Sequence, residues 1–130
     1  MARPASTHPT ELELDILKVL WRRGESTVRQ VREALAPARP LAHTTVITVM
    51  NIMVDKGYLE REPRGRSHLY RPRIKEGTVR RRMLSDLVRR AFDGSPAALM
   101  LNLLEESDLD RNELAELRRR LDEKRKEDGR

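Results

Sequence analysis

The segment 41–59, LAHTTVITVMNIMVDKGYL, constrains the fold of this chain more strongly than any other stretch. At helical spacing, its apolar residues fall at i, i+3, i+4 and i+7 and form one stripe: Val46, Val49, Met50 and Met53. The opposite side carries short hydrogen-bonding groups, of which only the last is an acid: His43, Thr44, Thr45, Thr48, Asn51 and Asp55. Gly57 follows, where a helix end needs a residue that tolerates positive φ. The segment predicts an amphipathic helix that fits a DNA major groove, and a threonine-rich face that only meets solvent is the alternative.

Two capping boxes precede this segment and mark the starts of two helices: Thr10 with Glu13, and Thr27 with Gln30. The first helix carries an apolar stripe that ends at Trp21, which we expect to seal it against the next helix. The second helix is short and must stop by Ala36, because the residue before Pro37 avoids helical angles. A short helix, a turn and a second helix with a polar outer face are the helix-turn-helix arrangement.

A β-hairpin is predicted directly after the polar helix. Residues 58–63 and 68–72 alternate as short strands, and Arg64, Gly65, Arg66 and Ser67 form the turn between them. In this position the hairpin would be the wing of a winged helix, with Arg64, Arg66 and Ser67 reaching DNA phosphates together with His43. The alternative is a scaffold turn whose arginines point into water.

The remaining chain is predicted to be helical and to hold two copies together. Residues 75–92 form an amphipathic helix, Ser95-Pro96 starts another, and Asp110 with Glu113 caps the last. Residues 97–105 are apolar nearly all round, so this helix must be buried, and a second copy is the natural cover. The expected homodimer interface comprises Leu84, Leu87, Val88, Leu99, Met100, Leu103, Leu104 and Leu117.

Charge is distributed unevenly along the 130 residues. Residues 1–73 carry 13 Lys/Arg against 8 Asp/Glu, and residues 74–130 carry 14 against 13. The first part is therefore suited to a polyanion, and the balanced second part to self-association. We expect a mainly α fold with a small β-hairpin wing, divided into a flexible arm (1–9), a winged-helix DNA-binding domain (10–73), a helical dimerisation domain (74–126) and a frayed tail (127–130).

Several kinds of chemistry are not expected. The chain has no cysteine, which excludes disulfides and thiolate metal sites and suits a reducing cytoplasm. No apolar run approaches the ~20 residues that span a bilayer, so no membrane insertion is expected. His8, His43 and His68 have no carboxylate at a catalytic or metal-binding spacing, and there is no phosphate loop or nucleophile motif. We therefore expect no catalytic residues, metal or cofactor, and no enzyme activity.

Four segments, taken together and in order, resemble the BlaI/MecI-type penicillinase repressor family of winged-helix regulators: Glu13–Trp21, Thr44–Arg61, Leu69–Pro72 and Leu99–Leu121. The resemblance implies a cytoplasmic homodimer that binds inverted-repeat operators and represses β-lactam-resistance or related stress genes. By position, the groove-reading side chains of the family fall on Thr44, Thr45, Thr48 and Asn51. Family members often carry longer basic residues where this chain has Ile47 and Ile52, which leaves the operator sequence open.

The resemblance also implies a switch. Repressors of this family are inactivated by proteolysis at an Asn-Phe bond in the dimerisation helix, downstream of a membrane sensor protease, and the matching bond here is Asn102-Leu103. The alternative for Asn102 is a polar residue that sets the register of a helical interface. The copper-responsive branch of the family uses C-terminal cysteines, so a copper sensor of that design is excluded.

A winged-helix adaptor that binds protein and does not touch nucleic acid is the alternative function. The basic bias of residues 1–73 argues against it. A heparin column at low salt would separate the two functions, because a DNA-binding repressor would be retained.

Overall fold

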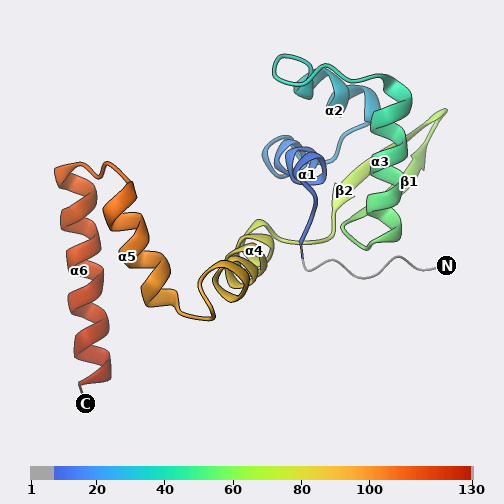
Figure 1. Cartoon of the computed structure of the whole chain (residues 1–130). Helices are drawn as coiled ribbons and strands as arrows, with labels where there is room; N and C mark the ends of the chain where they lie inside the picture. Colours follow the sequence, from blue (N-terminus) through green and yellow to red (C-terminus); the bar gives the residue numbers. More distant parts are fainter. Residues whose placement is uncertain (1–7, 130) are drawn as a thin grey trace. The chain divides into compact units, whose positions relative to one another are not determined.

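The computed structural model describes residues 8–129. Within this part the elements follow in the order α1 (Glu11–Arg23), α2 (Val28–Leu35), α3 (His43–Asp55), β1 (Leu59–Arg64), β2 (Ser67–Pro72), α4 (Glu76–Ala91), α5 (Pro96–Glu106) and α6 (Arg111–Asp128) (Figure 1). The predicted fold class is confirmed: the chain is mainly helical, with one antiparallel hairpin placed directly after α3. The boundary between two compact units falls inside α4, between Asp86 and Leu87. The expected division after residue 73 stays a prediction.

Both N-terminal capping boxes are present, because each helix start satisfies its own first backbone donors. The Thr10 hydroxyl accepts from the Glu13 amide at 3.3 Å, and a Glu13 carboxylate oxygen accepts from the Thr10 amide at 2.8 Å. Thr27 and Gln30 make the same pair of bonds at the start of α2. Helix α2 ends at Leu35, as the following proline requires.

The core of the N-terminal unit is built from one face of each of the first three helices and from the base of the hairpin. Val46, Met50 and Met53 of α3 are fully buried, and Val49 is half-buried at the edge of the stripe. They join a cluster from the other elements: Ile16, Leu17, Leu20, Val28, Val31, Leu35, Tyr58, Leu59, Tyr70 and Val79. Burial of this face leaves the opposite face of α3 outside, as its pattern predicts.

A buried ion pair joins the start of α1 to the end of α3. The Lys56 ammonium lies 2.8 Å from the second carboxylate oxygen of Glu13, whose side chain is only 3% exposed. Glu13 therefore serves the cap and the ion pair at once. The pair holds the C-terminal end of α3 against α1, on the inner side of the helix.

The hairpin is longer and its turn shorter than the sequence predicted. Strand β1 runs to Arg64 and β2 starts at Ser67, so the turn consists of Gly65 and Arg66, with Gly65 in the left-handed region at φ 61°. This is the two-residue connection that suits the twist of a hairpin. In addition, the Ser26 amide donates to the Tyr70 carbonyl at 3.0 Å, and the Tyr70 amide donates to the Ser26 carbonyl at 2.8 Å. The loop before α2 is thereby fastened to β2.

Two side chains have partners far away in the sequence. The Trp21 indole is half-buried against the core, and its N–H donates to the Ile74 carbonyl at 3.0 Å, just before α4. The expected arm lies outside the described residues except for its last two, His8 and Pro9. Pro9 is buried, and His8 Nε2 lies 3.1 Å from an Asp86 carboxylate oxygen. The sequence analysis found no carboxylate at a catalytic or metal-binding spacing from His8. The structure nevertheless gives His8 a carboxylate partner from α4, 78 positions away, which local spacing could not reveal.

In the C-terminal unit, α5 and α6 start at the predicted caps. The Ser95 hydroxyl accepts from the Ala98 amide, and Asp110 forms a capping box with Glu113. Helix α6 continues to Asp128, one residue past the predicted start of the frayed tail at residue 127. Ion pairs such as Arg119–Glu123 at i, i+4 support its second half.

Candidate nucleic-acid interface

The outer face of α3 is exposed at four of the five positions predicted to contact DNA there. His43, Thr44, Thr45 and Thr48 are exposed, and they occupy the first two turns of the helix. Helix α3 has no side-chain cap at Ala42 and no acid in its first turn. The Thr45 amide donates to the Ala42 carbonyl at 3.1 Å, so the backbone N–H groups of His43 and Thr44 are the ones left for an outside acceptor. The positive end of the helix dipole favours an anion there.

Asn51, the fifth position, lies in a different setting. It is half-buried, and its side-chain oxygen already accepts two hydrogen bonds from the wing. One comes from Arg61 Nη1 at 2.5 Å, and the other comes from the Tyr70 hydroxyl at 2.9 Å. Because a guanidinium can only donate, its contact identifies the atom as the amide oxygen of Asn51. The structure thus separates Asn51 from the three threonines.

Arg61 is a candidate residue that the sequence analysis missed. It lies on β1 two residues after the buried Leu59, opposite Tyr70 in the hairpin register, and it is exposed. Residues two apart share a face of a strand. The alternation that placed Leu59 on the inner face could therefore have placed Arg61 on the same face, towards α3.

The wing tip carries the predicted phosphate-contacting residues. Arg64, Arg66 and Ser67 are all exposed, at the turn end of the hairpin. Within the described residues no ion pair engages Arg64 or Arg66, so both can contact a DNA backbone that passes the tip. A contact of this kind positions a duplex and carries no sequence information.

The other face of the hairpin is occupied by an ion-pair cluster. The Arg71 guanidinium lies 2.5 Å from Glu60, 3.5 Å from Glu25 and 3.6 Å from Glu62. The hydrogen bond from Arg71 holds the pKa of Glu60 below its usual value, and Glu60 in turn raises the pKa of Arg71. With three carboxylates around one guanidinium, this face is unsuited to a polyanion. The two faces of the hairpin therefore differ in charge, and the face suited to DNA is the one that carries Arg61, on the α3 side.

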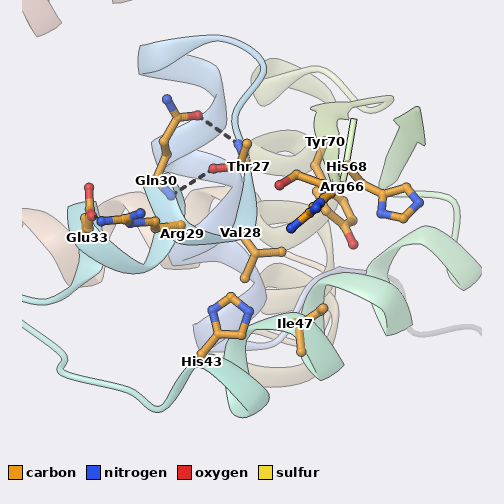
Figure 2. A pocket seen from close by; sticks show the side chains of 11 residues that line it. Thr27, Val28, Arg29, Gln30, Glu33, His43, Ile47, Arg66, His68 and Tyr70 are labelled. Atoms are coloured by element: carbon orange, nitrogen blue, oxygen red, sulfur yellow. Dashed lines mark hydrogen bonds and ion pairs between the residues drawn. The ribbon is translucent and has the colours of Figure 1, made fainter. Parts of the chain in front are cut away.

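A groove of about 590 Å³ lies between α2, α3 and β2. Figure 2 shows side chains of α2, His43 and Ile47 of α3, Arg66 of the turn, and His68 and Tyr70 of β2 around it. Polar and basic groups at its rim could accommodate a sugar-phosphate segment. Ile47 is half-buried in this groove, where a longer basic side chain would project.

Among residues 8–129, no three His, Cys, Asp or Glu side chains are arranged so that they could hold a metal ion. His43 and His68 both line the groove of Figure 2. Within the same residues, no helix is both long and apolar enough to cross a bilayer.

Large apolar side chains are exposed along the C-terminal unit and at Leu84, just before it. Neither α5 nor α6 has a buried residue in its described part, and the exposed set is Leu84, Leu87, Met100, Leu101, Leu103, Leu104, Leu114, Leu117 and Leu121, each between 43% and 60% exposed. Val88 and Leu99, also predicted for the interface, are half-buried. A groove of about 500 Å³ runs between α5 and α6, lined by leucines such as Leu104 and Leu117. Asn102 and Leu103 are both exposed on α5.

Comparison with known proteins gives a consistent result. A family model described as penicillinase repressor matches residues 9–123. The chain is 36% identical to the transcriptional regulator BlaI of Mycobacterium tuberculosis over 114 residues, which covers 82% of this chain and 83% of that protein. It is 26% identical to the penicillinase repressor of Bacillus licheniformis, with 88% and 89% covered. Among solved structures, the DNA binding domain of the repressor BlaI superimposes with a TM-score of 0.51 at 24% identity, covering 60% of this chain and 93% of that one. This likeness shows the fold of the N-terminal unit.

Proposed function

Because the chain belongs to the penicillinase repressor family, we propose that it is a sequence-specific transcriptional repressor that binds operator DNA as a homodimer in the cytoplasm. Its relatives are named as repressors and transcriptional regulators, which are not enzymes. Inverted-repeat operators of β-lactam-resistance or related stress genes are the proposed targets.

The exposed threonine face of α3 beside a basic wing tip is the observation that carries the proposal. Thr44, Thr45 and Thr48 present hydroxyl groups that can donate to or accept from base edges in a major groove. Arg64, Arg66 and Ser67 would contact phosphates on one flank, and His43 with the uncapped start of α3 would contact them on another. The same helix buries its other face, so the reading surface rests on a packed core.

The homodimer is supported by the exposed leucines of the C-terminal unit and by Leu84 just before it. A single protomer leaves α5 and α6 without buried side chains, and covering them with a second copy would remove this apolar surface from water. The proposed interface consists of Leu84, Leu87, Val88, Leu99, Met100, Leu103, Leu104 and Leu117. A two-fold dimer of this kind presents two α3 helices to an operator that is itself an inverted repeat.

The proposed switch is cleavage between Asn102 and Leu103 by a membrane sensor protease or a protease downstream of it. In a single protomer helix α5 has no buried residue, so it can open locally more readily than the helices of the core. Cleavage would disconnect α6 together with Leu103, Leu104 and Leu117 of the proposed interface, leaving two separate DNA-binding units. Each would bind alone, without the gain in effective concentration that the linked pair enjoys.

Fluorescence anisotropy with labelled duplexes tests the proposal. The full chain should bind palindromic promoter fragments more tightly than scrambled duplexes of equal composition, with affinity that falls steeply as salt rises. A chain truncated after Asn102 should lose most of this affinity. Equal affinity for palindromic and scrambled duplexes would refute specific binding, and unchanged operator affinity of the truncated chain would refute the proposed switch.

A further inference from the structure

Helix α3 lacks the side chain that reads guanine best. Residues 43–55 contain neither arginine nor lysine. In the major groove, guanine shows two acceptors side by side, N7 and O6, and a guanidinium meets both at once. A threonine hydroxyl has one donor, and it cannot make this paired contact. If the operator contains a guanine under α3, its reader must come from another element.

The hairpin brings a guanidinium to the polar face of α3. Arg61 Nη1 donates to the Asn51 side-chain oxygen at 2.5 Å, although the two residues belong to different elements. The Tyr70 hydroxyl donates to the same oxygen at 2.9 Å and helps to hold it in place. Tyr70 is itself only 2% exposed and is bonded through its backbone to Ser26, so the anchor is rigid.

The bonding leaves Arg61 available and Asn51 occupied. Within the described residues Arg61 has no carboxylate partner, in contrast to Arg71 with its three. Only one nitrogen of Arg61 contacts Asn51, so other donors of its five remain for a base. By contrast, asparagine reads adenine by accepting from N6 while donating to N7, and both lone pairs of the Asn51 oxygen are already engaged.

We propose that Arg61 reads a guanine of each operator half-site in the major groove beside α3, and that Asn51 and Tyr70 are positioning residues that aim it. This inference rests on the proposed DNA-binding function. It changes the role expected for Asn51 from base reader to support. The specificity surface is then composite: hydroxyls come from α3 and the guanidinium comes from β1.

Selection from a randomised duplex pool with the full chain gives the first test. The wild-type chain enriches a motif with an invariant guanine in each half, and Arg61→Ala loses the preference at that position alone. On the selected duplex the loss is about 5- to 150-fold, the range for one paired base contact. Arg64→Ala is the matched control: this exposed arginine at the wing tip should weaken all duplexes alike and keep the motif.

Replacing the guanine by 7-deazaguanine gives the second test, because it removes N7 and keeps base pairing. The wild-type chain loses affinity for the modified duplex, while Arg61→Ala binds the modified and unmodified duplexes equally. Asn51→Asp, which retains an oxygen acceptor for Arg61 and Tyr70, keeps the guanine preference, and Asn51→Leu diminishes it. A direct adenine reader would behave differently, since Asn51→Asp would abolish an adenine preference.

Three results would overturn the inference. The first is that Arg61→Ala weakens binding to all duplexes and leaves the motif unchanged, which identifies a phosphate contact. The second is that the wild-type chain and Arg61→Ala are equally sensitive to 7-deazaguanine, and the third is that Asn51→Asp loses a preference for adenine. Failure of the wild-type chain to enrich any motif would instead refute the proposed function. Circular dichroism of each variant verifies folding, which is expected to persist because Arg61 is exposed.

Discussion

Replacing Lys56 by methionine should destabilise the N-terminal unit by about 2–3 kcal/mol. Removal of one partner from a fully buried ion pair costs about 3–5 kcal/mol, because the remaining charge is left without compensation. Here Glu13 is 3% exposed, but the Lys56 side chain is 20% exposed, so water can partly replace the ammonium and the cost is lower. Methionine keeps much of the aliphatic stem, and the Thr10 amide still donates to Glu13.

Urea unfolding followed by the fluorescence of Trp21 measures this loss. Trp21 is the only tryptophan and lies in the N-terminal unit, so the signal reports that unit even if the C-terminal helices unfold separately. All variants are compared at one protomer concentration, because association would add to the apparent free energy of unfolding. Arg29→Met is the matched control: Arg29 pairs with Glu33 at i, i+4 with side chains 82% and 63% exposed, and its loss should cost under about 0.5 kcal/mol.

The double variant Glu13→Gln, Lys56→Met decides whether the charge is the cause. Glutamine keeps an oxygen for the Thr10 amide and carries no charge, so the double variant should recover most of the stability lost in Lys56→Met. A loss in Lys56→Met no larger than in Arg29→Met would refute the reasoning. So would a double variant that is no more stable than Lys56→Met alone.

Three further predictions follow from the other surfaces. Arg66→Ala should weaken binding to all duplexes alike and reduce the slope of log affinity against log salt by about one, as measured by anisotropy titrations; a changed motif would contradict a phosphate contact. Leu103→Asp should give a monomeric mass by light scattering at micromolar concentration while the N-terminal unit stays folded. A persistent dimer would place the interface elsewhere. Hydrogen bonds from Arg119 and then Arg120 lower the pKa of Glu116 from 4.5 to about 2, so their stabilisation of α6 is present above pH 4.5 and is lost as the pH falls through about 2. The stability difference between the wild-type chain and Glu116→Gln should shrink across that interval, and a constant difference would refute the assignment.

Local features of the fold could be predicted from the sequence. The helix starts at Thr10, Thr27 and Asp110 follow from side chains that bond within three residues, and the structure confirms them. The buried stripe of α3 follows from periodicity alone. These features are determined by residues within a few positions of one another, so they can be predicted from the sequence alone.

Features that depend on tertiary contact could not be predicted. The bonds of Asn51 to Arg61 and Tyr70 join residues 10 and 19 positions apart, and they require the hairpin to be folded back on α3. The pair of His8 with Asp86 spans 78 positions and involves a helix whose face cannot be assigned in advance. For the candidate interface, periodicity placed the threonines outside, but only the packed structure shows that the amide of Asn51 is already occupied.

Tyr70 joins three parts of the reading surface in one residue: its backbone bonds to the loop before α2, its ring lies in the core, and its hydroxyl bonds to α3. The distance between the wing and α3 is consequently fixed before the protein binds a duplex. Adjustment must then come from the DNA, through local changes in groove width and bending. Two operators that share the contacted bases but differ in the stiffness of the base pairs between them should therefore be bound with different affinities.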